Sequence, residues 1–96
     1  MHVLALSVDL HLPECRSLKG KRSTLRPILE GLRRKFMVSV SEVDHQDRWQ
    51  RALIGVALVA SSEAHATDVM DEVERFIWSF PDVQVLAASR SWLEAD

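Results

Sequence analysis

The chain has 96 residues and a formal net charge of −2, with 47% hydrophobic and 27% charged residues. This size and balance are typical of one soluble globular domain, and they exclude a disordered, collagen-like or low-complexity chain. No stretch approaches the ~20 apolar residues of a membrane helix, and the N-terminus lacks the basic start of a signal peptide. We therefore expect no membrane contacts. The single cysteine, Cys15, cannot form an internal disulfide, which is typical of the reducing cytoplasm, so we expect a cytoplasmic protein.

The first part of the chain predicts a strand followed by a helix. Residues 2–12 alternate between apolar and polar side chains, as in a half-buried strand, and Pro13 ends it. Ser17 can cap a helix over residues 18–36, where apolar residues recur at helical spacing. Since Pro27 lies inside this segment, we expect a kink there, or a helix that is regular only after its first turn.

The rest of the chain predicts three strands and a second helix. Residues 37–43 and about 50–60 alternate, so they predict two strands joined by a polar segment. One of the two serines after residue 60 can cap a helix that runs to about residue 79. Residues 83–93 alternate again and predict the fourth strand.

The order strand-helix-strand-strand-helix-strand is typical of ferredoxin-like folds. We therefore predict a single α+β domain over residues 1–96, a ferredoxin-like βαββαβ plait with a four-stranded antiparallel sheet and two helices on one face. The uncovered face would carry Leu53, Ala57 and Val59, with either Val85 and Ala87 or Leu86 and Ala88. Sheet-to-sheet packing of two copies is the simplest use of such an open face, so a homodimer is one predicted assembly.

Charge is distributed unevenly along the chain. Residues 16–35 sum to +7, whereas residues 36–96 sum to −7. Lys19, Lys21 and Arg22 crowd the start of the first helix, where the helix dipole disfavours cations, which suggests an anionic partner. The helix therefore predicts a phosphate-binding surface formed by Lys19, Lys21, Arg22, Arg26, Arg33 and Arg34.

The same charges also allow a simpler interpretation. Glu30 can pair with Arg26 and with Arg33 or Arg34, and the acidic second helix can neutralise the remaining cations, leaving an ordinary solvated face. The connection before the third strand has two interpretations as well. Trp49 and Arg51 can stack and hold a nucleotide base, or Trp49 can simply cover the edge of the core.

The residues predict no catalytic or metal site, and we expect no cofactor. Ser7, Asp9 and His11 share a strand face, but alternate strand residues lie ~6.5–7 Å apart, too far for a hydrogen-bonded relay. Their spacing matches no common metal-binding motif. We interpret Cys15 as a structural thiol.

Three strings carry a resemblance to a known family: SLKGKR at 17–22, LRPIL at 25–29, and FMVSVSEV at 36–43 leading into QDRWQR at 46–51. Together they resemble the YlxP-like family of small bacterial domains of unknown function over nearly the whole chain. The resemblance implies a ferredoxin-like plait, in agreement with the element order. Genes of this family often lie beside those for translation initiation factor 2 and ribosome-binding factor A, which implies a ribosome- or RNA-associated role. The family offers no established catalytic residues. Met37 stands where relatives often have Asn.

The sequence therefore favours a small non-enzymatic factor that associates with RNA or a ribosomal subunit through its basic first helix. The alternative is a homodimeric protein-interaction module without nucleic-acid binding, joined through the open sheet face or Trp78. A more remote alternative is an acylphosphatase-like hydrolase that uses Arg16, although the chain lacks the Asn such enzymes need.

Overall fold

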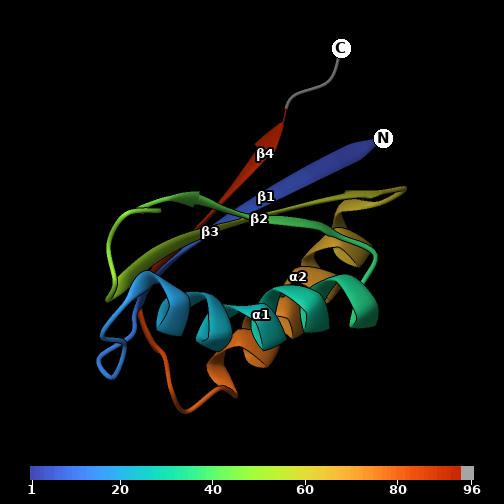
Figure 1. The fold of residues 1–96 in the computed structure, drawn as a ribbon. Coiled ribbons are helices and arrows are strands. Elements are labelled where there is room, and N and C mark those ends of the chain that lie inside the picture. The colour runs from blue at the N-terminus through green and yellow to red at the C-terminus, as the bar shows by residue number, and fades with distance from the viewer. Residues whose placement is uncertain (94–96) are drawn as a thin grey trace.

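A four-stranded antiparallel sheet carries both helices on one face in this computed structural model, which describes residues 1–93 (Figure 1). The strand order across the sheet is β2-β3-β1-β4. In chain order the elements are β1 (His2–His11), α1 (Leu18–Lys35), β2 (Ser39–Asp44), β3 (Arg51–Ala60), α2 (Glu63–Trp78) and β4 (Gln84–Leu93). The predicted ferredoxin-like βαββαβ plait is confirmed.

The two central strands, β1 and β3, alternate strictly between buried apolar residues and residues on the open face. Every second residue of β1 from Leu4 onward, and of β3 from Ala52 onward, points toward the helices and is buried. The helices contribute matching apolar stripes to the same core. The apolar core side chains of these four elements are Leu4, Leu6, Val8, Leu10, Ala52, Ile54, Val56, Leu58, Ala60, Leu25, Ile28, Leu32, Ala66, Met70, Val73 and Ile77.

Helix α1 is capped as the sequence predicts and runs without interruption through its proline. Ser17 is the N-cap, and its Oγ accepts a hydrogen bond of 2.9 Å from the Gly20 amide. The helix continues through Pro27 to Lys35, so the alternative of a helix regular only after its first turn is wrong. Pro27 and Ser23 both lie on the exposed side, where water can satisfy the Ser23 carbonyl that loses its amide partner.

The Ser17 cap gives a first stability prediction. Ser17→Ala leaves the Gly20 amide without its acceptor, and we expect it to lower the free energy of unfolding by about 1 kcal/mol. Urea unfolding followed by circular dichroism measures the change. Ser23→Ala is the matched control, because this exposed serine of the same helix caps nothing. Equal stability of the Ser17→Ala variant and the wild type would show that the cap contributes nothing.

Strand β4 exists as predicted, but it is not half-buried. It lies at the edge of the sheet, and only Val85 among its residues is partly buried. A register shift opposite Asp9 and Leu10 pairs Ala87 with Asp9 and Val85 with Leu10. Because Leu10 faces the helices and Asp9 the open side, Val85 and Ala87 lie on opposite faces. Neither predicted set of open-face residues is therefore correct.

Candidate nucleic-acid interface

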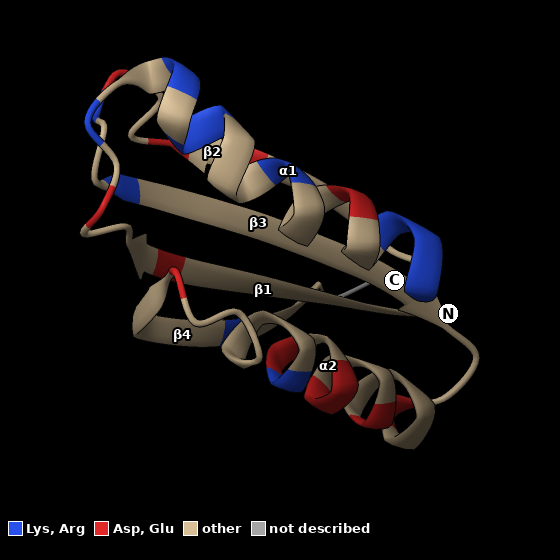
Figure 2. Cartoon of the chain, turned by 60° about the horizontal axis from the view of Figure 1, so that its bottom comes forward, with Lys and Arg blue, Asp and Glu red and all other residues tan. Residues whose placement is uncertain are grey.

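Helix α1 carries most of the basic residues of the chain (Figure 2). Six of them are exposed, and one of the six, Lys35, holds its Nζ over the rings of Phe36 and Phe76. None of the other five has a carboxylate within 4.0 Å among residues 1–93. We call these five the α1 basic face: Lys19, Arg22, Arg26, Arg33 and Arg34. The predicted pairing of Glu30 with its arginine neighbours is also absent from the described residues.

The acidic helix α2 pairs with β4 and not with α1. Arg90 of β4 donates from Nε to Glu74 at 2.9 Å and from Nη2 to Asp71 at 2.8 Å, and Arg75 pairs with Glu72 within α2. Figure 2 shows the acidic bands on α2 and the basic bands on the separate helix α1. Helix α2 therefore does not neutralise the α1 basic face in this structure.

Arg90 is strongly held by these two carboxylates. Partial burial acts to lower the pKa of the Arg90 guanidinium, but the hydrogen bonds and negative charges of Asp71 and Glu74 outweigh it and raise that pKa above its ordinary value. The Arg90 guanidinium therefore stays charged, as arginines in proteins generally do, and it remains the ion-pair partner of Asp71 and Glu74.

The start of α1 is electrostatically unusual for a helix. Its first turn contains no acidic residue, although the helix dipole favours acids there, and the exposed cations Lys19 and Arg22 lie nearby. At the other end, the last turn holds Arg33, Arg34 and Lys35, where the dipole favours cations. The C-terminal cations thus help the helix form, whereas those near the N-terminus do not.

Lys21 is a correction to the predicted phosphate-binding set. Only 2% of the residue is exposed, and its Nζ lies 2.6 Å from the His45 carbonyl and 2.5 Å from Glu42 Oε2. An ammonium held in this way cannot reach a phosphate. The spacing contained the signal, because Lys21 stands in the buried series completed by Leu25, Ile28 and Leu32.

The Lys21 contact ties the β2–β3 loop to the first turn of α1. His45 adopts a φ of 64°, unusual for a residue with a side chain, and Asp44 Oδ1 accepts from its amide at 2.7 Å. Gln50 Nε2 also donates to the carbonyls of Pro13 and Cys15, each at 3.2 Å. The loop that carries Trp49 is therefore fastened beside the N-terminal end of α1.

The structure supports Trp49 as an exposed side chain and weakens the prediction for Arg51. Trp49 is 53% exposed and lines a shallow hollow of about 440 Å³ with Arg48 and Arg51. Arg51, however, donates to both carboxylate oxygens of Asp9, with Nη2–Oδ2 at 2.6 Å and Nε–Oδ1 at 3.3 Å. The free cation beside Trp49 is therefore Arg48, which has no salt bridge within residues 1–93.

A groove of about 240 Å³ runs between α1 and β2. Its lining combines apolar stems of the helix with three guanidinium groups of the α1 basic face: Arg22, Arg26 and Arg33, together with Leu25, Leu29, Glu30 and Glu42. Arg33 also donates from Nη2 to the Val40 carbonyl at 2.8 Å, which orients its side chain toward β2. The groove thus offers three guanidinium groups, whose planar geometry suits phosphate oxygens, against two carboxylates, and one of these, Glu42, is already paired with Lys21.

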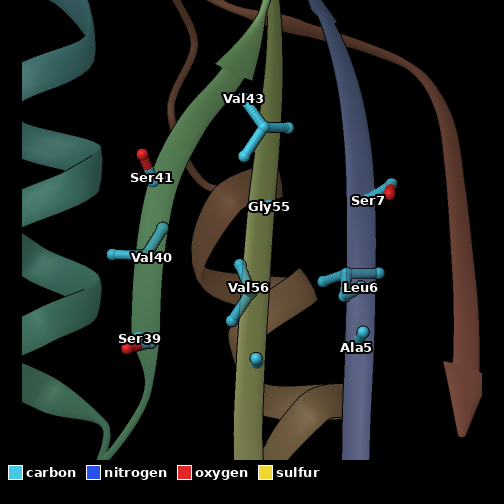
Figure 3. A pocket seen from close by; sticks show the side chains of 10 residues that line it. Ala5, Leu6, Ser7, Ser39, Val40, Ser41, Val43, Gly55 and Val56 are labelled. Atoms are coloured by element: carbon cyan, nitrogen blue, oxygen red, sulfur yellow. The ribbon is translucent and has the colours of Figure 1, made fainter. Parts of the chain in front are cut away.

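The open sheet face carries mostly small side chains. A shallow trough of about 430 Å³ crosses β2, β3 and β1, and Figure 3 shows three serine hydroxyls around it, from Ser7, Ser39 and Ser41. On the same face, Asp9 pairs with Arg51, and His11 Nδ1 lies 3.0 Å from Gln84 Oε1. Ser7, Asp9 and His11 therefore form no relay.

The loop after β1 does not resemble a phosphate site. Arg16 donates from Nη1 to the Pro13 carbonyl at 3.0 Å, and the nearby hollow also exposes the carboxylates of Glu14 and Asp82. Those charges oppose an anionic acyl phosphate. Cys15 is buried, with its Sγ 3.5 Å from Thr24 Oγ1.

Two further observations concern metals and membranes. Within residues 1–93, no three His, Cys, Asp or Glu side chains gather as a metal site. In the same part of the chain, neither helix is long and apolar enough to cross a membrane.

Comparisons with known proteins point to one family and one fold. The family model described as "Protein of unknown function (DUF503)" matches residues 3–90. "Uncharacterized protein YlxP" of Bacillus subtilis (strain 168) is 41% identical over 76 residues, covering 79% of this chain and 83% of that protein.

Among solved structures, the de novo designed protein Foldit4 is similar with a TM-score of 0.57 at 13% identity, covering 95% of this chain and 97% of the design. A dimeric ferredoxin-like protein from an uncultured marine organism gives 0.55 at 7% identity, covering 100% and 99%. At these identities the structures indicate the fold alone.

Proposed function

The chain belongs to the DUF503 family of proteins of unknown function, in agreement with the resemblance to YlxP, and we propose that it is a non-enzymatic factor that binds RNA on a ribosomal subunit through α1. One observation carries this proposal. The exposed cations of the α1 basic face have no carboxylate partner within residues 1–93, whereas three acids of α2 have partners outside α1: Asp71 and Glu74 pair with Arg90, and Glu72 pairs with Arg75. A surface whose charges are not neutralised internally is suited to a polyanion.

The length of the basic face suits a nucleic-acid backbone. From Lys19 to Arg34 the helix rises about 22 Å, at ~1.5 Å per residue, which is long enough to follow several phosphates. The helix is packed against the sheet through Leu25, Ile28 and Leu32, so its cations are presented on a rigid support. Little ordering of backbone is then required on binding.

Trp49 supplies a second kind of contact. It is exposed in the loop fastened beside the start of α1, next to the unpaired Arg48. An exposed indole can stack on an unpaired base, whereas the arginines of α1 contact phosphates. We therefore propose RNA that combines a backbone segment along α1 with an unstacked base at Trp49.

Co-sedimentation of the purified protein with ribosomal subunits tests the proposal. We expect sedimentation at low salt that is lost at high salt, with a log–log slope of roughly −0.7 per phosphate contact for single-stranded RNA. The variant Arg22→Glu/Arg26→Glu/Arg33→Glu should stay in the supernatant at all salt concentrations, after circular dichroism has shown that it folds.

A matched pair of single variants controls for net charge. Arg26→Glu and Arg75→Glu change the charge of the protein equally, but only Arg26 belongs to the α1 basic face. We expect Arg26→Glu to weaken binding and Arg75→Glu to leave it unchanged. Wild-type protein that remains in the supernatant at low salt, or equal binding by both single variants, would overturn the proposal.

The non-enzymatic part of the proposal has its own test. We expect no hydrolysis of acetyl phosphate above the uncatalysed rate, because Arg16 is folded back onto Pro13 and two carboxylates line the adjoining hollow. Turnover that disappears in an Arg16→Ala variant would instead support the acylphosphatase-like alternative. The predicted homodimer through the open sheet face stays a prediction.

A further inference from the structure

The two edge strands of the sheet, β2 and β4, differ in how well their backbones are protected from pairing with another strand. The β2 edge is short, and it is interrupted by a register shift between Glu42 and Asp44. Two of its carbonyls already accept side-chain hydrogen bonds: Val40 from Arg33 Nη2 at 2.8 Å, and Glu42 from Gln46 Nε2 at 3.4 Å. A short, bulged and partly capped edge is poorly suited to pair with another strand.

The β4 edge is longer and its backbone, as far as residue 93, is uncapped, although a register shift against β1 leaves Leu86, near the start of the strand, without a partner there. It is a ten-residue strand, Gln84–Leu93, and within residues 1–93 no side chain caps its backbone. It contains no Pro and no Lys, the residues that usually block an edge. Its one charged residue, Arg90, is turned toward Asp71 and Glu74 of α2.

Large exposed apolar side chains gather along this same edge. Leu86 is 51% exposed and Trp92 is 41% exposed, and Leu93 ends the strand with its side chain exposed. Trp78, on the last turn of α2, is also exposed and lies beside Val85 and Ala88 of β4. A long unpaired strand flanked by exposed Trp and Leu side chains is a surface that proteins normally cover.

We propose that a second copy of this chain covers it, through antiparallel pairing of β4 with β4 across a twofold axis at Ser89. In this register Leu86 of each copy comes opposite Trp92 of the other, since both lie three residues from Ser89. The bulge at Leu86 then lies at the ends of the paired segment, and residues 87–91 between the ends are regular. The residues between them are small apart from Arg90, so the two strands can approach. An interface that matches itself in this way is typical of a twofold homodimer.

The charges of the molecule agree with self-pairing at β4. Pairing brings the two acidic α2 helices closer together, but Arg90 neutralises the two α2 acids nearest to β4, Asp71 and Glu74. Helix α1 packs on the β2 side of the sheet, so both α1 basic faces stay outside the dimer. We therefore expect an association that added salt does not weaken, in contrast to nucleic-acid binding.

The open sheet face is a less suitable dimer interface. Its trough exposes the hydroxyls of Ser7, Ser39 and Ser41, and the Asp9–Arg51 ion pair lies at one end of the same face. Face-to-face packing of two sheets would remove these polar groups from water without assigned partners. Edge pairing instead satisfies backbone groups that are now unpartnered.

Analytical ultracentrifugation of the whole chain at micromolar to millimolar concentrations tests the proposal. We expect the wild type to be a dimer and Ser89→Lys to be a monomer, because two lysines would meet at the twofold axis. Ser41→Lys is the matched control, since this exposed serine lines the open-face trough on the opposite edge of the sheet. We expect it to remain a dimer.

Mixing provides a test of the register. Ser89→Glu alone should also be a monomer, whereas an equimolar mixture of Ser89→Glu and Ser89→Lys should recover the dimer, because residue 89 faces itself. Circular dichroism confirms that each variant folds. A monomeric wild type, a dimeric Ser89→Lys variant, or a mixture that stays monomeric would overturn the proposal. A monomeric Ser41→Lys variant would assign the dimer to the open face instead.

Discussion

Replacing Glu42 by Ala is expected to lower the free energy of unfolding by about 3 kcal/mol, because it leaves the Lys21 ammonium buried without its negative partner. The Lys21 side chain is 2% exposed, and its Nζ lies 2.5 Å from Glu42 Oε2. Breaking a buried ion pair from one side costs ~3–5 kcal/mol, and we take the lower end because Glu42 keeps partial contact with water. Urea unfolding of the two proteins measures the difference.

A double variant separates the ion pair from simple packing. Lys21→Met in the Glu42→Ala background removes the buried charge, so we expect it to recover most of the lost stability. Lys21→Met alone should be milder than Glu42→Ala, since Glu42 can reach solvent when its partner is gone, although the His45 carbonyl loses a donor. If Glu42→Ala unfolds at the same urea concentration as the wild type, the pair does not stabilise the fold.

Gly31→Leu is the second substitution with a large expected effect, a loss of about 2–3 kcal/mol from overpacking. Gly31 is where α1 meets α2, and a Cβ placed there would lie 2.9 Å from Phe76 Cε2 and closer still to Cζ. The Phe76 ring cannot move away freely, because it packs edge-to-face against Phe36 and Phe80, with centroids 6.0 and 5.2 Å away.

Gly20→Ala is the matched control for this substitution. Gly20 lies in the same helix, and an added Cβ there meets only Ser17 Oγ, at 3.3 Å. We expect little change, or a small gain from the better helix propensity of Ala. Thermal unfolding of both variants gives the comparison. A Gly31→Leu variant as stable as the wild type would mean that the two helices can separate at no cost.

The fold could be predicted because its signals are local. Alternation in residues 2–12 and 50–60, helical spacing after Ser17, and the prolines and serines at element ends each depend on neighbours a few residues away. The handedness of crossovers then leaves few ways to arrange six such elements. The basic character of α1 could also be predicted, since charged residues can be counted without knowing how their side chains are oriented.

The candidate site was only partly predictable, because exposure depends on what lies opposite. Lys21 and Arg22 are neighbours in sequence, yet one is buried against β2 and the loop at His45 and the other is exposed. In the sequence, Arg90 is one of four basic residues that stand among the eleven acidic residues of 36–96. Only the pairing of β4 beside α2 brings it to Asp71 and Glu74, which removes them as partners for α1.

By itself, then, the sequence determined the order of elements, the buried faces of β1, β3 and both helices, and the separation of positive from negative charge along the chain. Tertiary structure alone decided which strand lies unprotected at the edge, where the register shift places Val85 and Ala87, and which cations remain unpaired. The physical reason is the separation along the chain of the residues that each effect joins. Periodicity and capping act over a few residues, whereas burial and ion pairing join residues that are distant in the chain.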